Sequence, residues 1–359
     1  MNRQELEDRV SHGEILQGVD LSDLDLSGAN LSGAVFDHVR FPAAMRGVTM
    51  KETTITECDL SRCDLTGSEL HLTNVFKSYL DGARLDRSNL IGTSMVETSC
   101  EDCSFVSIEA PVATWVKCSV VGASFEGANL DRANFVEIVA DRTNFVRANL
   151  DRGTFYKLEM PTANLDGANL TLTTFVETNL GARAFRGMKL FRTQFMRGSV
   201  AGSTFAECDA TECNFTGVDV SGCNFAGANL KQALFGEARG EKVIFHRANL
   251  MNAIFERANL PAADFSGADM TQVYAAKAKL IGAKFINTTL SYCDLSHADL
   301  TAADFSHASM YRMKLHRATK TNAKIPAGAW TGDDAEAAQL EDWKPRHGAA
   351  QRAEEGRSS

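Results

Sequence analysis

Residues 123–150 read ASFEGANLDRANFVEIVADRTNFVRANL, and their pattern decides the fold. A large apolar residue recurs at every fifth position, as Phe125, Leu130 and Phe135 show. A small residue such as Ala123 stands two positions before each large one, and Asn or Asp often lies between them. The repeating unit is therefore A-(N/D)-(L/F)-x-x.

The five-residue period extends over most of the chain. One frame runs unbroken from Met45 to Ile325, and an earlier block from Leu16 to Phe41 is offset by one position, because Met45 follows Phe41 by four residues. A period of five fits neither a helix nor a strand. It fits a chain that turns a corner every five residues, four corners to a coil, with both apolar columns inside. The repeat region is long enough for roughly 15 coils, and coils stacked at about 4.8 Å would form a rod on the order of 70 Å long. The sequence therefore predicts an all-β solenoid.

These tandem repeats resemble the pentapeptide-repeat family over about residues 16–325. The resemblance implies a right-handed quadrilateral β-helix, and it says almost nothing about function. A solenoid leaves an unpaired edge at each end, so short helical caps are expected. We predict an N-terminal helical cap at residues 1–15, the β-helix at 16–325, a C-terminal cap at 326–344 and a disordered tail at 345–359.

The two caps are predicted from their apolar residues. Leu6 and Val10 would share one face of a short helix over the first coil. At the other end, Asp333 or Asp334 would N-cap a helix that closes the rod with the apolar residues Ala337, Leu340 and Trp343.

The interior columns account for the aromatic residues and the cysteines. Positions 20 residues apart should stack, which places Phe on two opposite interior columns and fills the lumen. The nine cysteines fall on inward positions and act as small apolar filler. Pairs such as Cys58 and Cys63 are five residues apart, and this is not the spacing of a zinc knuckle. We therefore expect no metal and no cofactor.

Outward positions, taken as the two that follow each large residue, carry the functional information. One outer column is apolar and is our candidate interface: Phe76, Val96, Val116, Val136, Tyr156, Val176 and Met196. Beside it runs a column of strictly alternating charge: Lys77, Glu97, Lys117, Glu137, Lys157, Glu177 and Arg197. The apolar column has two readings, strand propensity or a contact surface for a partner or a second copy.

Composition and motifs exclude several functional classes. There is no apolar run near 18 residues and no secretory signal at the N-terminus, so no membrane span and a cytoplasmic location are predicted. A net charge of −9 disfavours direct nucleic-acid binding. No phosphate-binding loop or hydrolase motif is present, and the chain is predicted not to be an enzyme. His297 and His316 are expected on adjacent coils, with no carboxylate aligned beside them.

Three functions remain open. The segment RQELEDRVSHGEILQGVDLSDLDLSGANL, residues 3–31, looks like pentapeptide-repeat proteins associated with bacterial type VI secretion, which implies an accessory or adaptor that contacts spike or effector components. The alternative is a DNA-mimicking binder of a topoisomerase such as gyrase. The third is a passive scaffold or a homodimer. All three are protein-interaction functions.

Overall fold

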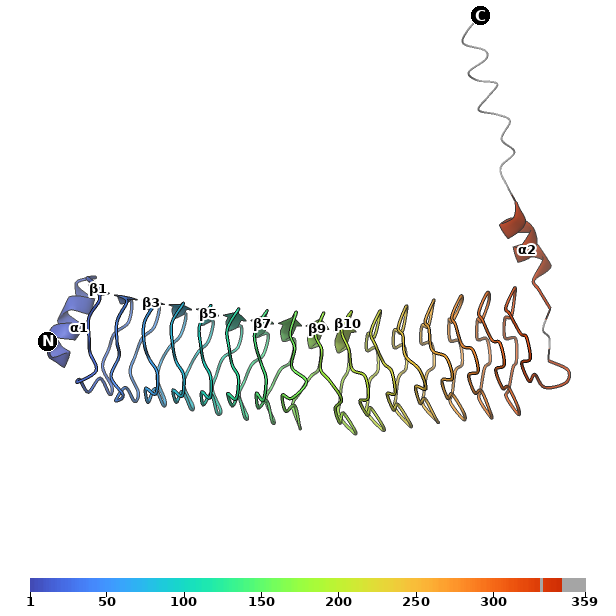
Figure 1. Ribbon diagram of the computed structural model, residues 1–359, viewed down its shortest axis with the longest axis horizontal. Coiled ribbons are helices and arrows are strands. Elements are labelled where there is room, and N and C mark those ends of the chain that lie inside the picture. Colours follow the sequence, from blue (N-terminus) through green and yellow to red (C-terminus); the bar gives the residue numbers. More distant parts are fainter. Residues whose placement is uncertain (330–331, 344–359) are drawn as a thin grey trace, which may run out of the picture.

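The computed structural model describes residues 1–329 and 332–343. It is a long rod of stacked coils with a short helix near each end (Figure 1). One face carries ten parallel three-residue strands in chain order: β1 (Ile15–Gln17), β2 (Val35–Asp37), β3 (Thr54–Thr56), β4 (Asn74–Phe76), β5 (Ser94–Val96), β6 (Thr114–Val116), β7 (Asn134–Val136), β8 (Thr154–Tyr156), β9 (Thr174–Val176) and β10 (Gln194–Met196). We call this side the strand face. The predicted all-β quadrilateral β-helix is confirmed.

Parallel pairing continues along the strand face beyond the named strands. Most paired residues are 20 positions apart, as Asn134 and Thr154 are, and single bridges extend the strand face from Gln194 as far as Lys314. Between β2 and β3 the step is 19 residues, with Val35 opposite Thr54. This shorter coil is the structural counterpart of the one-residue offset seen in the sequence.

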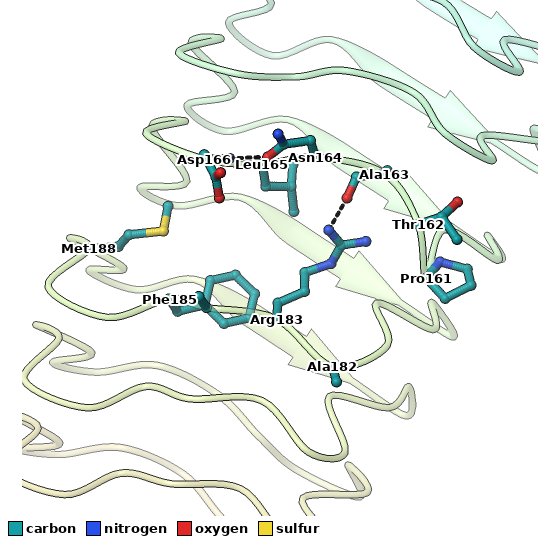
Figure 2. Close-up of a pocket in the computed structure, with 11 residues that line it drawn as sticks. Pro161, Thr162, Ala163, Asn164, Leu165, Asp166, Ala182, Arg183, Phe185 and Met188 are labelled. Carbon is teal, nitrogen blue, oxygen red and sulfur yellow. Dashed lines mark hydrogen bonds between the residues drawn. The ribbon is translucent and has the colours of Figure 1, made fainter.

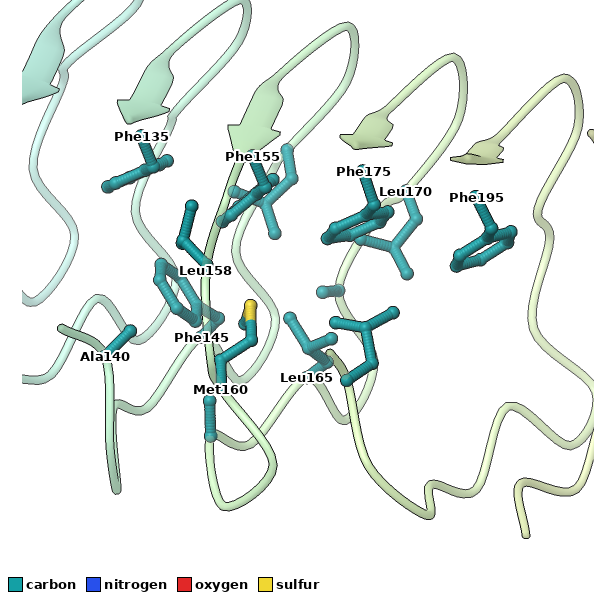
Figure 3. Packing of buried hydrophobic residues seen from close by; sticks show 14 of the residues in the cluster. Phe135, Ala140, Phe145, Phe155, Leu158, Met160, Leu165, Leu170, Phe175 and Phe195 are labelled. Carbon is teal, nitrogen blue, oxygen red and sulfur yellow. The ribbon is translucent and has the colours of Figure 1, made fainter. Parts of the chain in front are cut away.

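The interior is filled by the two apolar columns. Figure 3 shows successive rings of one column lying over one another, and Phe135 and Phe155 stack with centroids 4.9 Å apart. Rings from the opposite column meet these edge-on, as Phe135 and Phe145 do at 5.7 Å. The large and small inward positions are buried almost throughout, as predicted. A hydroxyl in the small column is satisfied by the coil before it, because Thr93 Oγ1 donates to the carbonyl of Leu70 at 2.8 Å.

Each corner is built by two local devices. The second residue after most large ones has a positive φ, from 47° at Lys77 to 62° at Lys277 among residues other than glycine, and glycine often occupies this position. The Asn or Asp before the large residue accepts a hydrogen bond from the backbone N–H two positions on, as Asn144 does from Val146 at 3.0 Å. This Asn/Asp position is half-buried or exposed. Three of the five positions therefore reach the surface, one more than predicted.

The N-terminal helix α1 (Arg3–Ser11) covers the first coil. Asn2 and Glu5 form a capping box at its start, and Leu6 and Val10 are buried beneath it. This confirms the predicted packing of the first helix.

The C-terminal helix α2 (Ala335–Asp342) begins at Asp334, whose carboxylate accepts from the N–H groups of Glu336 and Ala337. The expectation that it closes the end through its apolar residues is wrong, since Leu340 is 77% exposed and Trp343 70% exposed. Instead α2 lies beside the last coils (Figure 1), held by charged groups described below. The predicted disordered tail, residues 345–359, lies outside the described residues. Within those residues, no helix is long and apolar enough to cross a bilayer.

Candidate protein-contact surface

The seven residues of the candidate interface form one continuous row on the strand face. Each is the last residue of a strand from β4 to β10, and the register places each beside the next, for example Val136 beside Tyr156. Phe76 is 37% exposed, and the other six are half-buried. We call this row the apolar stripe. Whether a partner covers it stays a prediction.

The charged column lies directly beside the apolar stripe, at the left-handed corner positions. Lys77 Nζ is 4.0 Å from Glu97 Oε2, and both side chains are close to half exposed. One further member was not included in the sequence prediction. Glu57 lies 20 positions before Lys77 at the same corner position and extends the alternation of Glu with Lys or Arg to eight residues. The next residue of this column, His38, contacts Glu57 at 2.8 Å and is not counted, because a histidine is charged only when protonated. We call these eight the charge ladder: Glu57, Lys77, Glu97, Lys117, Glu137, Lys157, Glu177 and Arg197.

The two rows are also joined by contacts between their side chains. The ammonium group of Lys77 lies 4.9 Å from the ring centroid of Phe76, and that of Lys157 lies 5.1 Å from the ring of Tyr156. Hydrogen bonding and charge interaction with Tyr156, followed by the nearby Glu177 carboxylate, raise the pKa of Lys157. The stripe and the ladder thus form one surface, with apolar faces next to fixed charges of both signs.

Helix α2 covers the same strand face further along the rod. His297 Nε2 lies 3.0 Å from Glu341 Oε1, and Arg317 contacts both Glu341 at 3.2 Å and Asp342 at 2.7 Å. The carboxylate of Asp333 accepts the backbone N–H of Arg317 at 2.8 Å. Basic groups of the last coils therefore hold the acidic end of α2. The residues that it meets are continuations of the stripe and ladder columns.

His297 and His316 do lie side by side, with ring centroids 5.4 Å apart, as the sequence predicted. The expectation that no carboxylate accompanies them is wrong, because Glu341 of α2 reaches both. These three side chains could place one ligand atom each within 4.8 Å of one another, which is compact enough for a metal ion.

The tautomer of His316 opposes metal binding at this cluster. Its Nδ1 accepts the backbone N–H of Asp334 at 3.1 Å, so the ring proton of the neutral form sits on Nε2. Nε2 is the nitrogen that faces Glu341, at 3.5 Å. A metal bound to Nε2 would move the ring proton to Nδ1, and Nδ1 could then no longer accept the hydrogen bond from the Asp334 N–H. The cluster is therefore better described as an ionic latch for α2.

A second distinctive feature lies in the middle of the rod. Arg183 occupies a small inward position and is the one charged residue in that column between Val48 and Ala323. Its guanidinium donates to the backbone carbonyls of Met160 and Ala163, and its Nε is buried without a partner. Burial lowers the pKa of Arg183 to about 10, so the group is still charged at neutral pH.

The coils separate around this arginine (Figure 2). Within residues 1–329, no bridge joins Asn164 to Ala184 or Asn169 to Lys189, although both faces are paired before and after this point. A cleft of about 350 Å³ opens there, and Arg183 reaches from the coil of Phe185 toward Ala163 on its wall. The signal was present in the sequence as a charge in a small column, and the sequence prediction missed it.

The nine cysteines are all unpaired and buried, which agrees with the filler interpretation. Burial raises the pKa of the Cys58 and Cys118 thiols to about 11, and that of Cys63 to about 12. Thiols in this state react poorly, because the thiolate is the nucleophile.

Comparison with known proteins identifies the repeat. The family model described as pentapeptide repeat region matches residues 188–265, and the model described as pentapeptide repeats (8 copies) matches residues 15–45, 118–155 and 278–317. No curated protein matches the chain.

Several solved structures are similar to this chain. HetL, a pentapeptide repeat protein involved in heterocyst differentiation regulation from the cyanobacterium Nostoc, is 19% identical over 90% of this chain and 98% of its own, with a TM-score of 0.22. A pentapeptide repeat protein from the Arabidopsis thaliana thylakoid lumen is 24% identical over 30% of this chain and 72% of its own (TM-score 0.27). QnrB1, a plasmid-mediated fluoroquinolone resistance protein, is 18% identical over 52% of this chain and 84% of its own (TM-score 0.21). Likenesses this distant carry no argument about function.

Proposed function

Because the chain belongs to the pentapeptide repeat family, we propose that it is a non-enzymatic protein-interaction scaffold whose contact surface is the apolar stripe with the adjoining charge ladder. The observation that carries this proposal is the continuous register of the stripe over seven coils. Contiguous exposed apolar surface in a folded protein commonly marks a contact site.

Strand propensity alone accounts poorly for the stripe. The strands β1, β2 and β3 form with Gln17, Asp37 and Thr56 at the position in question, so an apolar residue is not required there. The column also becomes polar or small after β10, at Thr216 and Gly236, although pairing on this face continues. The apolar residues are therefore confined to one part of an otherwise regular face, as a dedicated contact surface would be.

For the biological role, we propose an accessory or adaptor of a bacterial type VI secretion machine. The support is the arrangement of the first 31 residues, in which a capped helix leads through Ile15–Gln17 into the first repeats. The partners of such an adaptor would be spike or effector components.

A pull-down from a bacterial lysate tests both parts, with type VI spike components and gyrase quantified. Three baits are compared: the native chain, the double variant Val136→Lys with Val176→Lys, and a control on the opposite face. The control is Val106→Lys with Val146→Lys, because these two valines are also half-buried, directly follow large residues and lie 40 positions apart.

The proposal predicts that the native chain and the control recover spike or effector components and that the stripe variant does not. Recovery of gyrase, with loss of its supercoiling activity, would replace the adaptor role by gyrase binding. Equal recovery of these components by all three baits would show that the stripe is not a contact surface and that its residues reflect strand propensity only.

A further inference from the structure

The charge ladder has a property that a single charged patch lacks. Its eight members alternate in sign without a break, and their number is even. A two-fold axis placed midway between Lys117 and Glu137 therefore relates every charge to one of opposite sign. The four unique pairs are Lys117 with Glu137, Glu97 with Lys157, Lys77 with Glu177, and Glu57 with Arg197.

We propose that the strand face binds a second copy of this chain in an antiparallel pair centred between Lys117 and Glu137. This inference rests on the proposed function, since it uses the same surface, and a second copy bound there would compete with spike or effector components for the apolar stripe. In such a pair the two copies are related by a two-fold axis that runs across the strand face, so each column faces itself in reverse order. Each ladder charge of one copy then faces an opposite charge of the other.

Other arrangements lose this match. Moving the axis onto a coil, for instance that of Glu137, would oppose like charges along the entire ladder. A two-fold pair with parallel rods would place the ladder opposite the other end of the strands, where neutral residues such as Asn74, Ser94 and Thr114 lie. Moving the axis by one full coil keeps opposite signs and leaves two members of each ladder without an opposing ladder charge. Only the central antiparallel register uses all eight.

The apolar stripe fits the same register. Val116 would face Val136 at the centre, and Phe76 and Tyr156 would each face a smaller valine, Val176 and Val96. Large residues thus oppose smaller ones, as a packed contact requires. Eight coils at about 4.8 Å give a contact roughly 38 Å long. Because only one face of each rod takes part, the buried area is near the lower end of the range for specific interfaces, and a weak, concentration-dependent dimer is expected.

Helix α2 leaves room for the second copy. In the central register the first coil of one copy, at Gly18, lies opposite Glu237 of the other. Side chains of α2 share a pocket with Tyr274, Ala276 and Lys277, two coils further along the same face. Two coils span about 10 Å, which is about the width of the N-terminal helix of the second copy. The second copy and α2 would therefore occupy successive parts of one face.

Two single charge reversals test the register. By symmetry, Lys117→Glu places two pairs of like negative charges at the centre of the dimer, and Glu137→Lys places two pairs of like positive charges there. Each variant alone should dimerise at least about tenfold more weakly than the native chain, because opposed like charges are costly at an interface. An equimolar mixture of the two should regain the native affinity, since both central pairs are again of opposite sign.

The matched control is a mixture of Lys117→Glu with Glu177→Lys. These positions do not face each other in the central register, so this mixture should stay weak. Sedimentation equilibrium over roughly 1–200 µM, a range suited to a weak dimer, gives the association constants. Circular dichroism of each variant confirms that the rod is folded.

The outcomes separate this inference from the proposed function. A native chain that is monomeric throughout overturns the second copy as occupant, and the proposed contact surface then stands or falls with the pull-down of the stripe variant. Dimerisation that is restored by the control mixture, or by neither mixture, overturns the central register. Restoration by Lys117→Glu with Glu137→Lys alone supports it.

Discussion

Lys77 Nζ lies 4.0 Å from Glu97 Oε2, one coil further along the strand face. Both side chains are close to half exposed, so solvent screens their attraction and the pair adds little to the stability of the rod. We predict that Glu97→Gln changes the free energy of unfolding by less than about 0.5 kcal/mol in chemical denaturation. The same variant should weaken self-association, because Glu97 faces Lys157 of the second copy. A large loss of stability with unchanged association would contradict this.

Arg183 is predicted to destabilise the native chain. The charged group of Arg183 lies in the small inward column, where the backbone pairing between two coils is interrupted. Replacement of a buried charge is often stabilising. Arg183→Thr would supply a hydroxyl to the carbonyl of Met160, as Thr178 does to Phe155 at 3.2 Å. We expect the free energy of unfolding to rise by about 1 kcal/mol.

Hydrogen exchange provides a local readout of the same substitution. The backbone amides of Leu165 and Leu170 should exchange more slowly in Arg183→Thr, since the coils can pair there. The control is Arg186→Ala in the same coil, whose side chain is 66% exposed and contacts Glu207 at 3.2 Å. It should change stability by less than about 0.5 kcal/mol. Unfolding of Arg183→Thr at lower denaturant concentration would show that the arginine supports the rod.

Val112 is a β-branched residue at a left-handed corner, with φ of 55°. This conformation is costly for a branched side chain and is tolerated by Asn. Val112→Asn is predicted to raise the free energy of unfolding by about 0.5–1 kcal/mol. The reciprocal change, Gly217→Val, should lower it by about 1–2 kcal/mol, because Gly217 has φ of 68° and open space around it. Thermal denaturation of the two variants measures both effects, and shifts in the same direction would refute the corner argument.

The docking of α2 should depend on pH. A hydrogen bond from His297, with further contributions from His316 and Arg317, lowers the pKa of Glu341. Acceptance of the Arg317 backbone N–H lowers the pKa of Asp333. A carboxyl group whose pKa is lower in the docked state than in the released state favours docking at any pH above its ordinary pKa. This contribution is lost as the pH falls through the lowered pKa. Docking should therefore persist at neutral pH and fail in acid.

Amide chemical shifts of α2 measured by NMR during acidification would follow its release. At neutral pH, Glu341→Gln should release α2 and leave the coils intact. Glu336→Gln serves as the control, because this residue lies in the first turn of the same helix and Glu341 is retained. Release by both variants alike would indicate loss of the helix itself rather than of the latch.

The fold could be predicted from the sequence because every coil repeats the same local rule. Large residues such as Phe125 and small ones such as Ala123 recur at a fixed spacing, and this alone determines which side chains are inside. The apolar stripe followed from the same arithmetic. Whether a partner covers the stripe did not follow, because spacing says where side chains lie and not what covers them.

Features that depend on distant contacts were beyond the sequence. The latch joins His297, in the repeats, to Glu341, which is 44 positions away and outside them. The expectation of an end cap relied on Leu340 and Trp343, whereas the charges of Glu341 and Asp342 determine where α2 lies. The outward role of the Asn/Asp position was missed because its hydrogen bond to the following turn is visible only in three dimensions.

One distance tests the antiparallel contact most directly. Because the native cysteines are buried, a spin label on Glu237→Cys, at an exposed corner outside the charge ladder, can be introduced selectively. In the central register the two labels of a dimer lie eleven coil steps apart, a separation of about 53 Å by pulsed dipolar spectroscopy. That distance would support the pairing of the two ladders. A separation below about 20 Å would indicate parallel rods, and the absence of any dipolar signal at high concentration would contradict the second copy altogether.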